Sequence, residues 1–170
     1  MSVSIRRARE DDLDFLAALV GHEEVQPFLA ASRPSDPAAI VDDIRRSEEE
    51  PELFGLYVVE VDDRRAGTMR FSSRGGANRI ADLGGLAVHP DFRGRKVADE
   101  AALLIRDHLL FDLGFHRLQL EIYAFNERAM RHAERVGFVL EGRKRRAYLR
   151  HGEWVDSVLY GLTTEDLETR

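Results

Sequence analysis

Alternating apolar and polar residues predict β-strands along much of the chain. Successive side chains of a strand point to opposite faces, so alternation marks a strand with one buried face. Such alternation occurs at about 2–8, 53–61, 66–73, 117–123, 138–149 and 154–162. Residues 80–88 are almost continuously apolar and predict a buried strand, which Gly84 and Gly85 interrupt. These glycines fit either a β-bulge or a simple tight bend.

Apolar residues recurring at helical spacing predict four helices. The segments lie at about 13–20, 36–49, 95–113 and 126–136. Asp11 and Asp12 precede the first helix and can cap it, and Gly21 is expected to end it. Residues 26–37 contain three prolines and predict a loop.

The order of these elements predicts the fold class. A strand and two helices come first, followed by three strands, a helix, a strand, a helix and two strands. This order describes an α/β protein with one mixed sheet and helices on both faces. The sequence contains no internal repeat or linker, so residues 1–170 are expected to form a single domain.

Composition restricts the chemistry. The chain has 170 residues, 44% of them hydrophobic and 33% charged, as in soluble globular domains. It has no cysteine, which excludes disulfides and zinc–thiolate sites and favours a cytoplasmic location. No apolar run approaches the roughly 20 residues that span a bilayer, and none at the start resembles a signal peptide. Its six histidines lack metal-ligand spacing, so no metal is expected.

Charges are unevenly distributed. The net charge is −6, from 31 acidic and 25 basic residues, and acidic residues, including Glu23 and Glu24, are dense before residue 65. Cations cluster in two places, at Arg93, Arg95 and Lys96 and at residues 143–146. The asymmetry indicates one half that attracts amines and another that attracts anions, or merely solvated surface.

Residues 86–98 resemble a phosphate-binding segment. A buried strand leads into a short turn, and three cations surround the start of a long helix. Placing cations there disfavours the helix by roughly 0.3–1 kcal/mol each, because the helix dipole is positive at that end. A bound anion would offset this cost, since the first amides of a helix are free to donate. The alternative is that these cations simply face water.

A series of motifs resembles the GCN5-related N-acetyltransferase (GNAT) family. The series comprises a strand leading to Val88-His89-Pro90, then Arg93-Gly94-Arg95-Lys96-Val97-Ala98, Leu118-Gln119-Leu120-Glu121-Ile122-Tyr123, Asn126-Glu127-Arg128-Ala129 and Val136-Gly137-Phe138. The ending, residues 142–162, is similar to the branch that contains ribosomal-protein N-terminal and spermidine acetyltransferases. The resemblance implies a mixed, mostly antiparallel sheet of about seven strands with four helices, and strands that splay apart at an acetyl-CoA site.

The resemblance also implies which residues bind acetyl-CoA. The backbone of Leu86, Ala87 and Val88 would pair with the pantetheine arm, and Asn126 would hydrogen-bond that arm from the other side. The pyrophosphate would be held by the amides of Arg93, Gly94, Arg95, Lys96, Val97 and Ala98. Lys96 occupies a position that is usually glycine, so its side chain must point away from the pyrophosphate or wrap over it.

Amine acetylation requires a neutral amine. A lysine-like amine needs about 4–5 kcal/mol to lose its proton at pH 7, so a general base helps most with such acceptors. Glu121 is the candidate base, with a pKa raised by burial; alternatively it is an exposed strand residue. The backbone between Gly85 and Val88 is the expected oxyanion site.

The family's usual acid is a tyrosine, and Ala133 occupies that position in this chain. By resemblance, members of the ribosomal-protein branch also lack this tyrosine. Tyr123 and His132 are possible substitutes; the alternatives are that Tyr123 packs on a strand face and that His132 lies on the exposed side of its helix.

The sequence therefore predicts an acetyl-CoA-dependent N-acetyltransferase acting by direct attack in a ternary complex. The expected acceptor is a cationic amine, such as a peptide N-terminus or a polyamine, approached by Glu23 and Glu24. Two alternatives are a catalytically silent coenzyme-binding regulator and a nucleic-acid-binding module that uses the cations at 143–146. The acidic net charge argues against a nucleic-acid partner. No membrane partner is expected, and apolar positions in the final strands are compatible with a homodimer.

Overall fold

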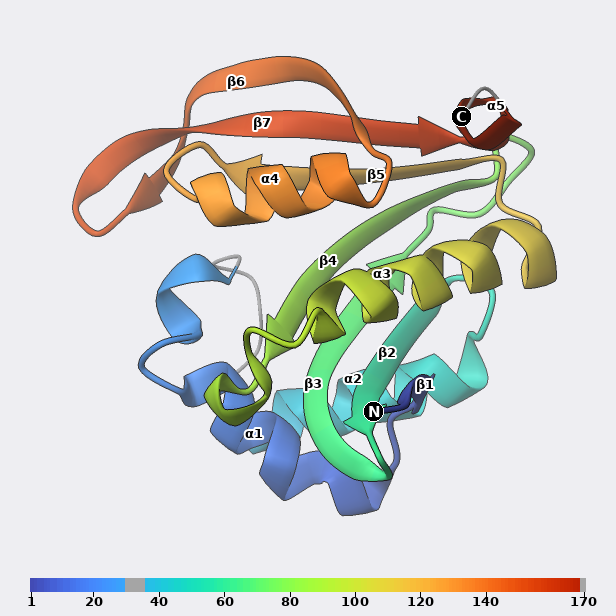
Figure 1. The fold of residues 1–170 in the computed structure, drawn as a ribbon, viewed down its shortest axis with the longest axis vertical. Helices are drawn as coiled ribbons and strands as arrows, with labels where there is room; N and C mark the ends of the chain where they lie inside the picture. The colour runs from blue at the N-terminus through green and yellow to red at the C-terminus, as the bar shows by residue number, and fades with distance from the viewer. Residues whose placement is uncertain (30–35, 169–170) are drawn as a thin grey trace.

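The predicted strands form one seven-stranded sheet in the order β1-β2-β3-β4-β5-β7-β6 (Figure 1). The computed structural model describes residues 1–29 and 36–168. The strands are β1 (Val3–Arg7), β2 (Phe54–Val61), β3 (Arg64–Ser72), β4 (Ile80–Val88), β5 (Arg117–Tyr123), β6 (Val139–Arg150) and β7 (Glu153–Thr163). Among the strands of the described residues, only β4 and β5 pair in parallel. The expected mixed, mostly antiparallel sheet is therefore confirmed.

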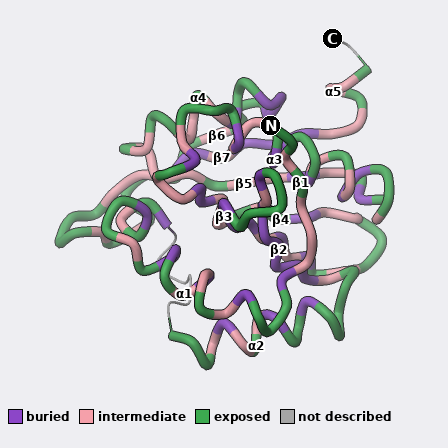
Figure 2. The backbone as a smooth tube through the Cα atoms, turned by 60° about the horizontal axis from the view of Figure 1, so that its bottom comes forward, coloured by how far each residue is buried: buried purple, intermediate pink, exposed green. Residues whose placement is uncertain are grey.

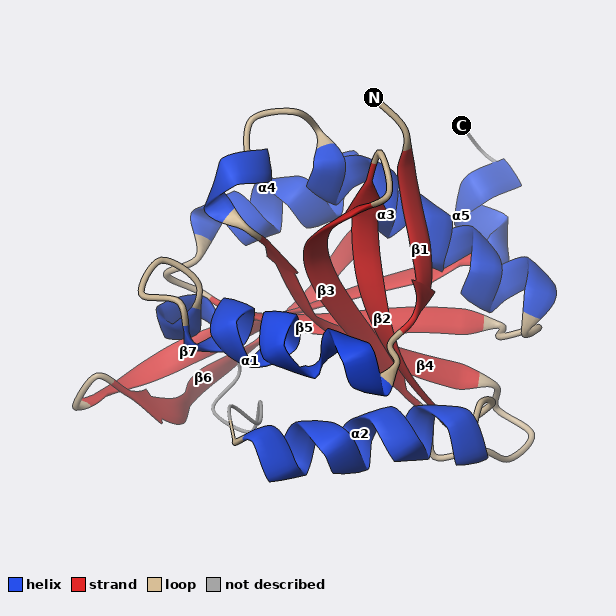
Figure 3. Cartoon of the chain, turned by 90° about the horizontal axis from the view of Figure 1, so that it is seen from below, coloured by secondary structure: helices blue, strands red, loops and turns tan. Residues whose placement is uncertain are grey.

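The four predicted helices are also present. They are α1 (Leu13–Gly21), α2 (Pro37–Glu49), α3 (Val97–Asp107) and α4 (Glu127–Arg135), and a short α5 (Thr164–Glu168) follows β7. Helices α1 and α2 lie on one side of the sheet, and α3 and α4 lie on the other (Figure 3). The α/β layer architecture expected from the element order is confirmed.

Each face of the sheet has its own apolar core. On the α1 and α2 side, Leu16, Ile44 and Val58 are almost fully buried. On the α3 and α4 side, the core includes Leu109 and Leu118. Figure 2 shows buried segments concentrated along the central strands. Because both faces are covered, the central strands are apolar on both sides, as the near-continuous hydrophobicity of residues 80–88 predicted.

Several local predictions need correction. Asp12 does not cap α1 with its side chain; the carboxylate instead pairs with Arg6 and Arg65. Residues 26–28 form a 3-10 turn rather than plain loop, and residues 30–35 lie outside the described part. Helix α3 begins two residues later than expected and continues into a π-helical turn, His108–Asp112. Within the described residues, none of the helices has the length and apolarity needed to cross a membrane.

Candidate functional site

Strands β4 and β5 part halfway along the sheet. They pair only from Ile80 with Arg117 to Leu83 with Leu120. Figure 1 shows β4 and β5 diverging from their common end near α5. Beyond Leu83, β4 is paired only with β3 among the described strands. The backbone of Leu86, Ala87 and Val88 therefore presents an edge toward the opening, the arrangement expected for pairing with an extended ligand.

A β-bulge bends β4 where the strands part. Thr68 faces Ala87 while Arg70 faces Gly84, so one extra residue of β4 is inserted between these pairs. Gly85 has φ +64°, in the left-handed region that glycine adopts without steric cost. No atom lies within 4 Å of the position a Cβ would take on Gly84. Of the two predictions for these glycines, the bulge is confirmed, and the space above Gly84 is open.

Free amides line the turn before α3. None of the backbone amides of residues 94–99 donates a hydrogen bond to another described residue. The first backbone bond of the helix runs from the Glu100 amide to the Lys96 carbonyl, at 3.0 Å. Gly94 has φ +77°, and the space that a side chain would enter there is empty of protein atoms to 4 Å. Arg95, Val97 and Ala98 complete the segment, and its free donors suit a diphosphate.

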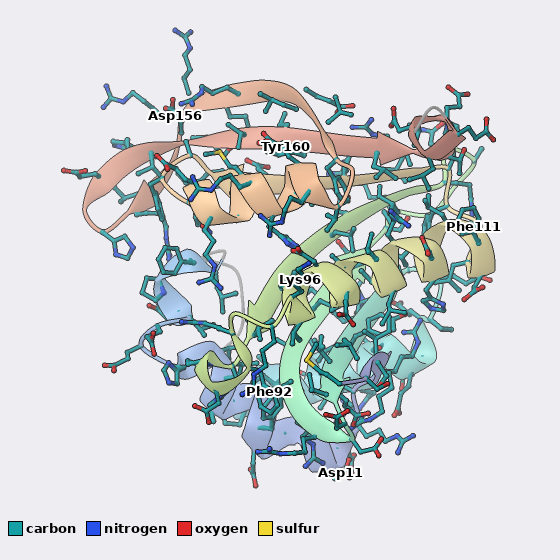
Figure 4. All side chains as sticks on the ribbon, viewed as in Figure 1. Asp11, Phe92, Lys96, Phe111, Asp156 and Tyr160 are labelled. Atoms are coloured by element: carbon teal, nitrogen blue, oxygen red, sulfur yellow. The ribbon has the colours of Figure 1, made fainter. Side chains whose placement is uncertain are left out.

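Lys96 adopts the backbone conformation that explains why glycine is usual there. It is the N-cap of α3, with φ +60° and ψ +14°. An L-residue in the left-handed region costs roughly 1–2 kcal/mol relative to the right-handed one. Lys96 is exposed and lies at the start of α3 (Figure 4). The motif lysine therefore keeps the backbone geometry of the turn at an energetic cost and adds a cation beside the free amides.

Arg93 and Glu24 bind each other. Arg93 donates to Glu24 Oε1 at 3.0 Å and to the Glu24 carbonyl at 3.1 Å. The prediction assigned Arg93 to the coenzyme and Glu24, with Glu23, to the acceptor. The pair joins the turn before α3 to the segment after α1, so these two predicted regions are adjacent. Their roles toward ligands, and that of Glu23, stay predictions.

Asn126 follows β5 and opens α4 as its N-cap. Its Oδ1 accepts a hydrogen bond from the Ala129 amide at 3.1 Å and caps the helix. Its side-chain amide donates to no other described residue, so that group is available to a ligand carbonyl. The expected contact with the pantetheine arm is compatible with this geometry and stays a prediction.

Helices α3 and α4 are joined by Asp99. Its carboxylate accepts from His132 Nδ1 at 2.7 Å and from Arg135 Nη2 at 2.8 Å. The His132 side chain is only 17% exposed, so the expectation of an exposed position is wrong. Burial lowers the pKa of His132 more strongly than Asp99 raises it. His132 therefore acts as a link between helices.

Glu121 lies on β5 next to the point where pairing with β4 ends. Its carboxylate accepts from Ser157 Oγ at 2.5 Å and from Lys144 Nζ at 2.9 Å. Burial alone would raise its pKa, but hydrogen bonds from Ser157, Lys144 and Tyr148 outweigh burial and lower it. The predicted raised pKa is therefore wrong, because strands β6 and β7 supply donors that the β5 sequence does not reveal.

Tyr123 belongs to an aromatic group at the end of β5. Its ring stacks on Phe125, with centroids 5.4 Å apart, and meets Tyr148 edge-on at 5.6 Å. This packing matches the alternative interpretation of Tyr123, and its role as an acid is still a prediction. Ala133, at the usual tyrosine position, is 1% exposed within the core.

The cations at 143–146 sit on an irregular stretch of β6. Lys144 faces Ser157 and Tyr148 faces Val155, so Asp156 alone stands opposite residues 145–147. Arg143 pairs with Asp156 and Lys144 pairs with Glu121, which uses two of the four cations within the protein. Figure 4 places Asp156 at this end of the sheet. No group of metal-ligand residues occurs in the described part of the chain.

Sequence reasoning missed several residues of this site. Ser157, Lys144 and Arg150 come from the last two strands, where no local motif marks them. Arg150 donates to the carbonyls of Pro27 and Leu29, at 3.2 and 3.3 Å, more than 120 positions away in the chain. Alternation along β6 and β7 could have placed Lys144 and Ser157 on one face, but only the strand register brings them to Glu121.

Comparison with known proteins agrees with this geometry. A family model described as an acetyltransferase (GNAT) domain matches residues 2–139. The SPbeta prophage-derived uncharacterized N-acetyltransferase YokL of Bacillus subtilis (strain 168) is 30% identical over 83 residues. That alignment spans 49% of this chain and 47% of the relative, about half of each protein.

Two further proteins match over most of the chain. Spermidine N(1)-acetyltransferase of Escherichia coli (strain K12) is 22% identical over 157 residues, covering 92% of this chain and 83% of that protein. The solved spermidine N-acetyltransferase from Vibrio cholerae in complex with CoA and spermine superimposes with a TM-score of 0.83 over 96% of both chains. At 17% identity, the latter match shows a common fold.

Proposed function

This chain belongs to the GNAT acetyltransferase family, and we propose that it acetylates a primary amine by direct attack on acetyl-CoA within a ternary complex. The family prediction made from the motifs is confirmed by the family match over residues 2–139. The donor is acetyl-CoA and the acceptor is an amine, in keeping with the N-acetyltransferases to which the chain is similar.

This proposal rests on one combination of features: the free backbone amides before α3 and the separation of strands β4 and β5. The amides of residues 94–99 would hold the pyrophosphate, with Arg95 and Lys96 adding positive charge. The unpaired edge of β4, from Leu86 to Val88, would hold the pantetheine arm opposite Asn126. When bound, acetyl-CoA supplies the thioester whose carbonyl the amine attacks.

Direct attack by the amine is the proposed route. The chain has no cysteine to carry the acetyl group as a thioester intermediate. The amine nitrogen bonds to the acetyl carbon, the carbon–sulfur bond breaks, and the thiolate leaves. A thiol pKa near 8.5 lets water protonate that thiolate, so a dedicated acid adds little. The backbone between Gly85 and Val88 is the proposed donor to the oxyanion.

We assign proton removal from the amine to Glu121, directly or through water. The side chain points to the face on which α1 and α2 lie, as judged from the strand register, and its carboxylate is held by Ser157 and Lys144. A lowered pKa makes it a weaker base than predicted, so its contribution is greatest for acceptors that must lose a proton at the site. Tyr123 remains the candidate acid.

The relatives named for spermidine support a small amine acceptor. Glu23 is the remaining exposed acidic residue of the predicted acceptor pair, because Glu24 is engaged by Arg93. A cytoplasmic reaction is consistent with a chain that contains no cysteine. Assembly into a homodimer is a further prediction.

The decisive experiment incubates the protein with acetyl-CoA and a panel of amines and measures free thiol. We expect thiol release that depends on the amine, with intersecting initial-rate lines, because both substrates must be bound together. Arg95→Ala should raise the KM for acetyl-CoA, more so at low salt, whereas Arg45→Ala, an exposed cation on α2, should not. Coenzyme binding without amine-dependent thiol release would instead identify a silent regulator.

A further inference from the structure

Among the described residues, Arg150 is a cation without a carboxylate partner. Its guanidinium lies 5.3 Å from the centroid of the Tyr123 ring and, within residues 1–29 and 36–168, donates only to the Pro27 and Leu29 carbonyls. Its Nε is buried and has no hydrogen-bond partner among the described residues. No carboxylate of the described residues lies within 4.0 Å, and residues 30–35 contain neither Asp nor Glu. Both hydrogen bonds come from Nη2 and Nε is enclosed by protein, so Nη1 is the donor of this half-buried charge that an anion from outside the chain could use.

The carboxylates near Arg150 are already matched by other cations. Glu121 pairs with Lys144, and Glu24 pairs with Arg93. On the other side of the opening, Arg70 stands opposite Gly84 and reaches Asp43 at 3.5 Å. After these pairs are counted, Arg150 is the half-buried charge left without an ion pair among the described residues here, whereas Glu153, opposite it on β7, and Glu23 are exposed to solvent.

Arg150 also lies at a useful distance from the reacting centre. It covers Tyr123, which is two residues beyond Glu121 on the same face of β5. Two residues of strand span about 7 Å. An amine deprotonated near Glu121 could therefore extend a short carbon chain along β5 and place a carboxylate at Arg150. Phe125 stacks on Tyr123, and Phe28 approaches Phe125 at 6.4 Å, so apolar surface lines this path.

We propose that the acceptor is an amine that carries a carboxylate, and that Arg150 binds this carboxylate. The assignment rests on the proposed acetyl transfer and narrows its substrate class to amino-acid-like molecules. A polyamine would bring a second positive charge to Arg150 and is disfavoured. Arg150 thus determines acceptor specificity at a distance from the bond that forms.

Three four-carbon amines test the proposal. 4-Aminobutyrate, butylamine and 1,4-diaminobutane share a primary amine and differ in the charge at the far end. For the unmodified protein we expect kcat/KM to be highest for 4-aminobutyrate and lowest for the diamine. In Arg150→Gln, kcat/KM for 4-aminobutyrate should fall about 10- to 100-fold, to the value for butylamine, which should change little. Longer and shorter amino acids define the optimal length.

Two further variants separate recognition from folding. Arg150→Lys keeps the charge and should retain part of the preference for 4-aminobutyrate. Arg145→Gln removes an exposed cation from the same strand and should leave the preference intact. An equal loss of kcat/KM for all three amines in Arg150→Gln would show that Arg150 only holds residues 27–29. A preference of the unmodified protein for the diamine would reject a carboxylate acceptor. Either result overturns the proposal and leaves acetyl transfer standing. Thiol release with other amines of the panel but with none of these three would also overturn the proposal, whereas no thiol release with any amine of the panel would remove acetyl transfer itself.

Discussion

Asp12 joins three separate segments through one buried carboxylate. Its side chain is fully buried and accepts from Arg6 at 2.7 Å, from Arg65 at 2.6 Å and from the Arg9 amide at 2.8 Å. Burial raises its pKa, but the hydrogen bonds from these groups outweigh burial and hold the pKa well below the usual value. The carboxylate stays ionised because every lone pair that faces the protein has a donor.

Replacing this carboxylate should destabilise the fold. Asp12→Asn leaves Arg6 and Arg65 without their shared anion, and we expect a loss of about 3–5 kcal/mol in the free energy of unfolding. The folded pKa lies below the unfolded value, so the stabilisation is complete above about pH 5 and declines as the pH falls toward the folded pKa. Urea unfolding from pH 3 to 7 should show this slope in the unmodified protein and a smaller slope in Asp12→Asn. Asp42→Asn, an exposed control, should keep the full slope.

The role of Glu121 can be tested with amines of different pKa. Glu121→Gln keeps the size of the side chain but cannot accept a proton. We expect kcat to fall about 100-fold for amines with a pKa near 10 and less for amines with a pKa near 8, because the latter are partly neutral at pH 7. Since hydrogen bonds lower the pKa of Glu121, any acidic limb that this group gives to kcat should lie at lower pH than for an ordinary glutamate. Equal loss across the amines would assign Glu121 a purely positional role.

Among the elements, the first turn of α3 combines an N-cap residue in a costly conformation with free amides that we propose bind the coenzyme. Lys96 holds the left-handed conformation at the N-cap, and the amides around it are free. Lys96→Gly should increase the free energy of unfolding by about 1 kcal/mol relative to Lys96→Ala, because only glycine adopts this conformation without a steric cost. Both variants lose the same cation, so both should bind CoA several-fold more weakly. Thermal unfolding and calorimetric titration separate the two effects, and a less stable glycine variant would contradict the conformational argument.

Elements with a periodic pattern were predictable, and those without one were not. Seven strands and four helices follow from spacing because each buries one apolar face. Helix α5 was missed because Leu167 is its sole apolar residue. The irregular stretch of β6 was missed because residues 143–146 are polar on both faces, which gives no hydrophobic signal for register.

The candidate site also has a part that was predictable from the sequence and a part that was not. The turn of residues 93–98 was predictable because its motif is contiguous in the sequence. The contacts of Arg93 with Glu24, 69 residues apart, and of Arg150 with residues 27 and 29 depend on packing between distant segments. The lowered pKa of Glu121 likewise depends on donors from β6 and β7, so its direction could not be derived from β5 alone.

At the scale of the whole molecule, the two halves of the sheet are joined by short strand pairing and by one apolar core on the α3 and α4 side. Strands β4 and β5 pair over four residues, and Asp99 links α3 to α4 on one face. In Figure 3, strands β5, β7 and β6 lean away from β1, β2 and β3. A coenzyme held between β4 and α4 would connect both halves, so its binding should stabilise the entire fold.

The expected stabilisation can be measured. CoA at 100 times its Kd should increase the free energy of unfolding by about 2.7 kcal/mol and Tm by about 5–10 °C. Arg95→Ala should have the Tm of the unmodified protein without CoA and a smaller increase at the same CoA concentration. The absence of any increase in Tm at millimolar CoA would contradict the coenzyme site.

The interruptions in β6 have a consequence for solubility. This outer strand carries exposed Val139, Leu140 and Leu149, and a straight strand of this kind would act as a template on which other chains add as in a fibril. Register shifts divide it into runs of at most three consecutive residues, and Arg146, with φ +50°, turns the backbone out of line. An incoming strand therefore finds no long row of aligned amides and carbonyls, so we expect this rim to resist the addition of further strands despite its apolar residues.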